Sequence, residues 1–459
     1  MDLVTRFNDS FNSFWQTWQG IEKPPSYLNP TYFSISSSEE KRVERYQKFW
    51  KYYNGEHEQF LKVSPNKLND NITLNYSKRI VNKSNNFLFS KPVLIDIEEY
   101  QDTALEENLK LIFTTQELQQ TFFSELGLNG AITGDYYIQI KIDEDGTPRP
   151  RNLNPLIVFP KLNKFDSSII ESYDIRVPSS SETWRILHYP LDDVWNVEYQ
   201  ILDERLNHWL TDTDKSYIWE YSFPMIIKGK NLPKPNSIYG YSDLEDADIN
   251  DYINVASSNL NKIIRLFAHP IIWGRNFNLD GADLSQIQMS NDEKAVLEAL
   301  ELTRDLTSAS DYISSLKTAY HEINSIPESD PEKLKIGAQS GFALNVLNND
   351  LMLKTELKRS LYGQTIKEFY NKAFFILGFE DVNVKLNWQN PLPIDLREQT
   401  DGHRFDIESS LVSKKTLSAQ RGYDYEEEVK RQEQEQTFTE SLGSSLLRQF
   451  ERGVNTASF

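Results

Sequence analysis

The 459-residue sequence contains no cysteine. Without thiols the chain can form no disulfide, no iron–sulfur cluster and no thiolate zinc site, and an intracellular origin fits this composition. The sequence also lacks long apolar runs, since none comes near the roughly 18–20 residues that a membrane-spanning helix requires. We therefore expect no membrane partner.

The motifs of common catalytic sites are missing as well. The chain has no G-x-x-x-x-G-K-[ST] phosphate loop and no G-x-S-x-G nucleophile elbow. His321-Glu322 is not followed by the second histidine of a zinc-protease motif, and the six histidines are scattered outside metal-ligand spacing. These absences predict a protein that is not an enzyme and that uses no metal and no cofactor.

Basic residues are fewer than acidic residues. The chain has 68 acidic and 49 basic residues, a net charge of −19. A protein that coats nucleic acid by bulk electrostatics needs a strongly basic surface, so that class is disfavoured. A channel through which DNA slides without sticking remains compatible with this charge. The alternative is that the acidity only maintains solubility.

The chain is long enough for two to four modules, and its 39% of hydrophobic residues can form real cores. Apolar spacing and breaker residues predict an α+β protein. Predicted helices span residues 39–53, 71–90, 103–132, 243–267, 307–325 and 342–377. Single strands are predicted at 93–97, 271–273 and 381–388. A hairpin is predicted from residue 136, with its turn at 145–146. A β-rich lobe follows the hairpin, with strands at 155–160, 170–176, 182–188, 194–201 and 216–221. Residues 294–303 fit a helix or a strand equally well.

The predicted helix 243–267 combines a narrow apolar stripe with a long polar face, which suits a bundle or a ring wall better than a globular core. The stripe consists of Ile249, Ile253, Ala256, Leu260, Ile264 and Phe267, and the polar face of Asn250, Asp251, Asn254, Ser257, Asn261, Lys262 and Arg265.

A breaker segment, residues 326–341, separates two helical patterns. Prolines cannot sit inside a helix and glycines free the backbone, which predicts four hinge residues: Pro327, Pro331, Gly337 and Gly341. Lys333 and Lys335 in this segment suggest an anionic ligand, and further basic residues follow on the helix behind it: Lys354, Lys358 and Arg359. A plain solvated loop is the simpler alternative.

Two acidic groups are candidate cation sites. Residues Asp143 and Asp145 with Gly146 suggest calcium, but the loop is too short for an EF-hand and a hairpin turn is favoured. The cluster of Asp243, Glu245, Asp246, Asp248 and Asp251 suggests a metal site. Favourable charge at a helix N-terminus is the preferred explanation.

Several segments, in this order and spacing, are similar to motifs of the portal proteins of tailed bacteriophages, the siphophage type of head-to-tail connector. They are KYYNGEH at 51–57, the helix 71–93, the helix-to-hairpin step 125–146, SIYGYSDLEDADINDYINVASSNLNKII at 237–264, SGFALNVL at 340–347, NPLPID at 390–395 and VSKKTL at 412–417. The resemblance covers about residues 45–430.

The resemblance implies a mainly helical α+β portal fold that forms a cyclic ring, usually of twelve subunits, around a central channel. It implies these regions: an N-terminal arm and α/β wing (1–239), a first stem helix (240–268), a clip (269–306), a second stem helix (307–325), a tunnel loop (326–341), a long wing helix with a strand (342–395) and a crown (396–459). Clips of this family close by β-pairing between subunits, so the resemblance favours a strand within 294–303.

The resemblance also implies a function at the unique capsid vertex of the virion, after assembly in the host cytoplasm. Double-stranded DNA would be packaged and ejected through the ring, with tunnel-loop residues Lys333, Lys335, Gln339 and Ser340 facing it. Implied partners are further copies of the chain, the terminase large subunit, a head–tail adaptor and the major capsid protein, with scaffold protein as a further candidate. Two alternatives are another virion structural or adaptor protein and a metal-dependent nucleic-acid enzyme that uses the acidic cluster.

Overall fold

The computed structural model describes residues 36–57, 61, 71–97, 109, 111–178, 183–203, 208–268, 272–275, 296–299, 306–328, 345–380, 382–392, 408–409, 412, 418 and 428–431. The chain divides into two units, Met1–Lys335 with Val346–Pro391, and Ile336–Asn345 with Leu392–Phe459. All helices and strands below belong to the first unit. Over the described residues, no helix combines the length and the apolar character needed to cross a bilayer.

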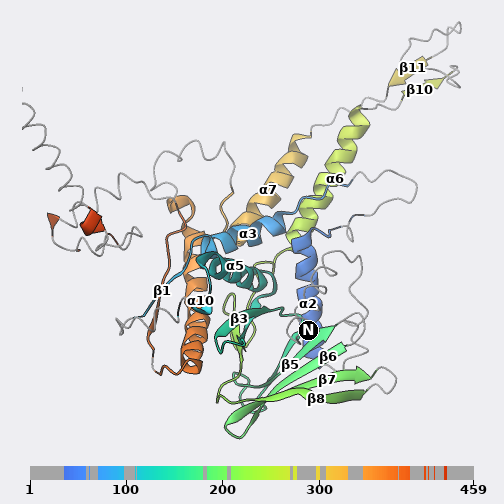
Figure 1. Ribbon diagram of the computed structural model, residues 1–459. Helices are drawn as coiled ribbons and strands as arrows, with labels where there is room; N and C mark the ends of the chain where they lie inside the picture. Colours follow the sequence, from blue (N-terminus) through green and yellow to red (C-terminus); the bar gives the residue numbers. More distant parts are fainter. Residues whose placement is uncertain are drawn as a thin grey trace, which may run out of the picture. The chain divides into compact units, whose positions relative to one another are not determined.

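The two larger sheets among the described residues are antiparallel (Figure 1). One is a five-stranded meander, with strands β4 Val158–Leu162, β5 Ile170–Pro178, β6 Thr183–Leu191, β7 Val194–Asp203 and β8 His208–Trp219. The other has the order β3-β2-β9, with β2 Asp135–Ile142, β3 Pro148–Leu153 and β9 Ile226–Lys230. The predicted β-rich lobe and the hairpin are confirmed, and Gly146 takes a left-handed φ of 80° at the hairpin turn.

Four helices pack around these sheets and against one another: α2 Ser37–Asn54, α3 Tyr76–Phe89, α5 Gln116–Thr133 and α10 Asn349–Ile376. The predicted stop of the first helix is confirmed, because Gly55 adopts φ 85° and donates its N–H to the last-turn carbonyls. The main core lies between α3, α5, α10 and the sheets. There Tyr136 of β2 stacks on Tyr362 of α10 with ring centroids 4.2 Å apart.

One predicted helix begins later than expected, and two others are interrupted. Helix α3 begins at Tyr76 rather than at residue 71, because the Asn75 side chain caps it by accepting from the Lys78 N–H. In the predicted helix 103–132, residues 109, 111 and 112 are helical, residues 113–115 are not, and α5 begins at Gln116 behind a Thr115 cap. In the predicted helix 342–377, residues 345–347 are helical, Asn348 forms a turn and α10 begins at Asn349, whereas residues 342–344 lie outside the described part of the chain. Apolar periodicity continues through these boundaries, whereas the side-chain caps fix where α3 and α5 start.

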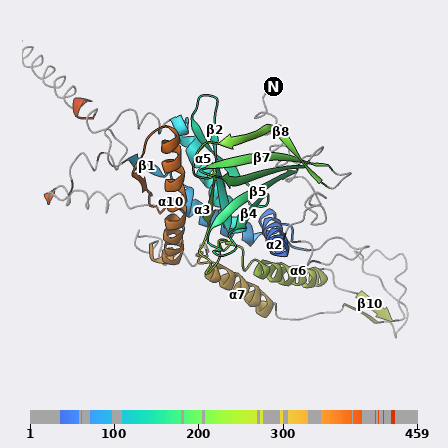
Figure 2. The same ribbon diagram turned by 90° about the horizontal axis from the view of Figure 1, so that it is seen from below.

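Two further strand pairs and one helix pair complete the unit. Strands β1 Leu94–Ile97 and β12 Val384–Asn387 pair antiparallel, as do β10 Ile272–Arg275 and β11 Val296–Ala299. The strand expected within 294–303 is thereby confirmed. Helices α6 Asp248–Ala268 and α7 Thr307–Ile323 lie side by side in both views (Figures 1 and 2).

Candidate functional site

One apolar cluster joins the N-terminal part of helix α6 to the C-terminal part of helix α7. Ile253 of α6 and Tyr320 of α7 are fully buried there, together with Ile80 of α3 and Leu351 of α10. The first residues of the predicted apolar stripe on α6 therefore pack against the neighbouring helices. Further along the helix Ile264 is 48% exposed, so this end of the stripe is not covered by the described parts of the chain.

Part of the predicted polar face of α6 points inward. Asn250 and Asn254 of this face are buried at successive turns, and Ser258 is buried one turn further on. Each holds the segment before α3. Asn250 donates to the Leu74 carbonyl at 2.8 Å, Asn254 accepts from the Leu74 N–H at 2.9 Å, and Ser258 accepts from the Ile72 N–H at 2.9 Å. Because 71–75 is not helical, its backbone groups need such partners. Lys262 and Arg265 of the same predicted face are exposed.

The first turn of α6 is tied to α2 by its carboxylates. The Tyr52 hydroxyl donates to Asp248 at 2.7 Å and to Asp251 at 2.5 Å. Lys48 pairs with Asp248 at 2.7 Å, and the buried His57 lies 3.3 Å from Asp251. Burial raises the pKa of Asp248, but the hydrogen bonds from Lys48 and Tyr52 outweigh it and hold the pKa below its ordinary value. In the described ranges no group of three or more His, Asp or Glu side chains is placed to hold a metal.

The segment just before α6 is clamped onto the junction of α5 and β2 by close backbone contact. A Cβ atom on Gly240 would lie 2.3 Å from the Gly134 carbonyl oxygen, a distance that no side chain tolerates. The Ser242 hydroxyl lies within hydrogen-bonding distance of two α5 carbonyl oxygens, and the Gly240 N–H donates to buried Asp135 at 3.1 Å. The resemblance segment 237–264 therefore contains the anchor of the helix pair.

A buried ion network completes the anchor. Asp243 is fully buried and pairs with Lys358 at 2.5 Å and with Lys354 at 3.1 Å. Lys358 also donates to Ser84 of α3 at 2.8 Å. Burial opposes the charge of Asp243, but the two ammonium groups hold its pKa below the ordinary value. Burial lowers the pKa of Lys358 to about 8, against the raising effect of Asp243.

This network overturns the expectation that the basic residues of α10 serve an anion beside the breaker segment. Lys354 and Lys358 are committed to Asp243 inside the fold. Arg359 donates to the Gln389 carbonyl at 2.6 Å and pairs with Glu356 at 2.8 Å. The three cations join α10 to the segment before α6 and to the chain around β12.

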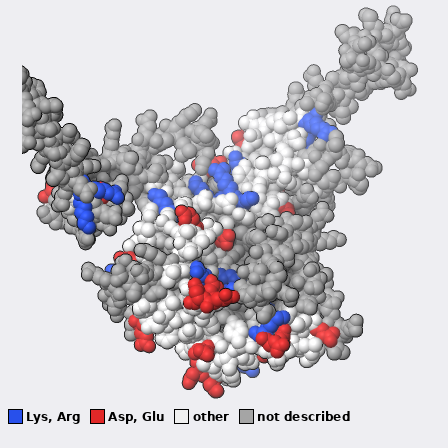
Figure 3. Space-filling view, viewed as in Figure 1, with Lys and Arg blue, Asp and Glu red and all other residues white. Residues whose placement is uncertain are grey.

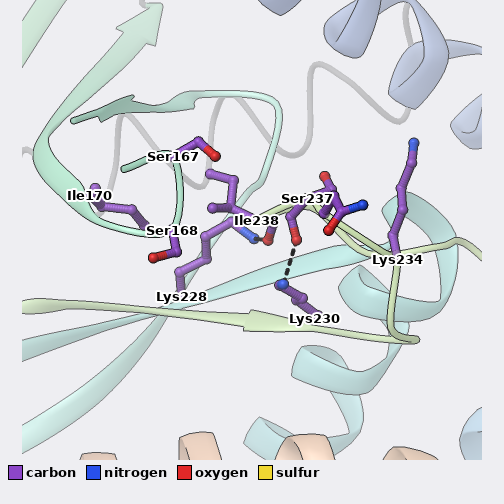
Figure 4. A pocket seen from close by; sticks show the side chains of 9 residues that line it. Ser167, Ser168, Ile170, Lys228, Lys230, Lys234, Ser237 and Ile238 are labelled. Carbon is purple, nitrogen blue, oxygen red and sulfur yellow. Dashed lines mark hydrogen bonds between the residues drawn. The ribbon is translucent and has the colours of Figure 1, made fainter. Parts of the chain in front are cut away.

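A pocket of about 510 Å³ lies between the β4–β5 turn and the segment after β9 (Figure 4). Its lysines already have partners in the fold. Lys228 donates to Asp135 and to the Ile238 carbonyl, Lys230 donates to the Ser237 carbonyl, and Lys234 lies over the Tyr241 ring. The lysines therefore hold the segment that leads to α6, and we assign no ligand to the pocket.

The family described as "Phage portal protein, SPP1 Gp6-like" matches residues 33–440 of the chain. The chain belongs to this family of portal proteins. A search of curated proteins gave no match. Among solved structures, the neck of an empty GTA particle computed with C6 symmetry is similar at 13% identity, covering 76% of this chain and 90% of that chain with a TM-score of 0.45. The neck of a native GTA particle computed with C12 symmetry is similar at 11% identity, with 76% and 89% covered and a TM-score of 0.38.

The resemblance to portal proteins is thereby confirmed, and the portal protein is a phage head-to-tail connector of a structural, non-enzymatic family. Most of the predicted DNA-facing site lies outside the described residues. This holds for the tunnel-loop residues and for three of the hinges: Lys333, Lys335, Gln339, Ser340, Pro331, Gly337 and Gly341. Pro327 is described, lies outside α7, and accepts a hydrogen bond from Lys83 at 3.3 Å.

Sequence reasoning missed a group of cations where α3 meets α7. Arg79 and Lys83 of α3 and Lys317 of α7 all lie close enough to His321 to affect its protonation. Burial first, then Arg79, lowers the pKa of His321. The four residues are spread over more than two hundred positions, so no local signal in the sequence links them.

Proposed function

We propose that this portal protein forms a closed ring, of twelve copies, at the unique capsid vertex of the virion. Double-stranded DNA would pass through its channel during packaging and ejection. The terminase large subunit would dock first and a head–tail adaptor later, with the major capsid protein, and scaffold protein during assembly, around the ring. Assembly would take place in the host cytoplasm.

One observation carries the ring proposal. The helix pair is firmly anchored at its base, yet along its length it exposes large apolar side chains: Tyr252 at 65%, Tyr312 at 57%, Ile264 at 48% and Ile263 at 38%. A monomer gains nothing from such exposure, whereas neighbouring copies packed around an axis would bury it. This supports helices 240–268 and 307–325 as the stem.

The other regions follow from the same assignment. Residues 269–306 with the β10–β11 pair would be the clip, 326–341 the tunnel loop, and 396–459 the crown. The wing would comprise 1–239 and 342–395. Lys333, Lys335, Gln339 and Ser340 would face the DNA from hinges at Pro327, Pro331, Gly337 and Gly341.

The charge balance supports conduction rather than tight binding. Each phosphate that a protein neutralises strengthens DNA binding and makes the affinity fall more steeply as the salt concentration rises. A chain with a net charge of −19 keeps such contacts few and transient. The lack of a phosphate loop supports a ring without enzymatic activity, driven by a separate ATPase.

Mass measurement of the purified protein tests the ring. Twelve copies of 53.5 kDa should give a particle of about 0.6 MDa with a central channel in negative-stain images. Monomers or dimers under all salt conditions, without any ring, would contradict the proposal.

The tunnel loop has its own test. Replacing Lys333 and Lys335 together by alanine should leave the ring mass unchanged and reduce DNA packaged per particle, because the lysines would touch DNA and not a neighbouring subunit. Ring mass and packaged DNA are both measured, with Lys161→Ala and Lys164→Ala together, two exposed lysines of the β lobe, as the matched loss of two cations. Loss of the ring in the double variant would show that the loop has been misassigned.

A further inference from the structure

The last turn of α7 borders a groove of about 640 Å³ that is lined by both apolar and acidic side chains. Four large side chains from three segments are exposed in it: Tyr241 at 39%, Ile323 at 55%, Leu353 at 63% and Leu357 at 45%. Exposed apolar side chains scattered singly are ordinary, but four that converge on one groove indicate a surface that another molecule covers.

The rim of this groove is acidic. Asp246, before α6, and Asp350, in the first turn of α10, are both exposed, and neither forms an ion pair within the described part of the chain. Lys354 also lines the groove, but its ammonium is held by Asp243 at 3.1 Å. A partner should therefore bring positive charge together with some apolar surface.

A different face of α7 is basic. Lys317 lies over the Tyr76 ring of α3 at 5.6 Å, which adds aromatic surface, and Arg79 and Lys83 follow on the next two turns of α3. Blue atoms gather where α3 and α7 meet in the space-filling view (Figure 3). Glu328 lies 4.0 Å from Lys317 and is a carboxylate beside these three cations.

Helical geometry places the two surfaces on different sides of the same helix. Ile323 follows Lys317 by six residues, a rotation of about 240° around the axis at 3.6 residues per turn. It follows His321 by two residues, or about 200°. A ring needs two different, complementary surfaces on each subunit, one for each neighbour. The acidic apolar groove and the basic α3–α7 patch meet that requirement.

We propose that the groove of one subunit receives the basic α3–α7 patch of the next copy of this chain. Asp246 and Asp350 would then face Arg79, Lys83 and Lys317 of the neighbour, while the apolar residues of the groove become buried. The inference rests on the proposed ring and specifies which surfaces form its subunit interface.

Charge reversal tests the interface. The groove variant carries Asp246→Lys and Asp350→Lys, and the patch variant carries Arg79→Glu and Lys317→Glu. Each alone places like charges opposite one another, so the fraction of subunits in rings should fall by at least about tenfold. Asp193→Lys with Glu220→Lys, two exposed acids of the β lobe, makes the same charge change as the groove variant and should leave the rings intact.

Mixing the two variants gives the deciding result. The reversed groove of one variant is complementary to the reversed patch of the other, and their unaltered surfaces also match. Equal amounts of the two should therefore form rings of alternating subunits, measured by native mass spectrometry with one variant isotopically labelled. Circular dichroism of each variant alone checks that its fold is retained.

The outcomes separate the two proposals. If the unaltered protein forms no ring, the proposed function fails. If it forms rings and the single variants do so equally well, or if the mixture does not restore them, the ring stands and this interface is overturned. If the patch variant keeps its rings but binds duplex DNA less tightly in a gel-shift assay, the patch contacts DNA and the inference is wrong.

Discussion

Replacing Asp243 by alanine should lower the free energy of unfolding by about 3–5 kcal/mol, because removing one partner of a buried ion pair leaves uncompensated charge. Lys358, whose side chain is 1% exposed, would keep only Ser84 as a partner. Chemical denaturation measures the change, and the thermal midpoint should fall by about 3–6 °C for a chain of this length.

Two comparisons make this result specific. Glu368→Ala removes an exposed pair with Lys372 on the same helix and should cost less than about 1 kcal/mol. The pKa of Asp243 is lower in the folded protein than in the unfolded chain. Its stabilising contribution is therefore complete above the unfolded pKa near 3.9 and is lost as the pH falls toward the lower folded value. The difference in the free energy of unfolding between the unaltered protein and the alanine variant should shrink below about pH 4. If this difference is small at pH 7, or stays constant down to pH 3, the role of Asp243 is contradicted.

Gly240→Ala should be the second severe substitution. The added Cβ would lie 2.3 Å from the Gly134 oxygen and 2.8 Å from the Leu232 oxygen, and both are backbone atoms that cannot rotate away. The segment before α6 must shift, which weakens the hydrogen bonds of Ser242 and Asn231 to their backbone partners. We expect a loss of about 2–4 kcal/mol in a denaturation experiment, together with reduced ring assembly.

Gly363→Ala on α10 is the matched control. Only Leu386, at 3.7 Å, lies near the added atom, which is an ordinary contact. Alanine is favoured over glycine inside a helix by about 1 kcal/mol, so this variant should be as stable as the unaltered protein or more stable. If both variants behave alike, the close approach of Gly240 to Gly134 does not explain the result.

Local patterns predicted an element well where all the residues that specify it lie within one short segment. Helix α2 with its Gly55 stop, the β2–β3 hairpin and helix α7 were all expected, because capping residues, alternation and helical periodicity act over a few positions. The start of α3 was misplaced and the breaks before α5 and α10 were missed, because apolar periodicity continues through these positions.

Pairing between distant segments was not predictable. Strand β9 was not among the predicted strands, and it joins β2, about ninety residues earlier. Residues 294–303 fitted either element until β11 was found paired with β10. Register and partner depend on contacts across the sheet, which a single strand does not encode.

The sequence by itself determined the class of this protein. The absence of cysteine and of phosphate-loop motifs, the acidic balance, and the order of short motifs pointed to a portal protein, and the family match over 33–440 confirms it. Only the tertiary structure decided what the charged residues do. Lys358 reads as a surface lysine on an amphipathic helix, yet it is buried against Asp243, 115 positions away. Arg79 and Lys317 lie far apart in the sequence, yet the fold brings Lys317 over Tyr76 of α3, one turn from Arg79. Whether a charge is buried and paired or exposed depends on which distant groups the fold brings within a few ångströms, and Coulomb energy depends on that distance and on the surrounding dielectric.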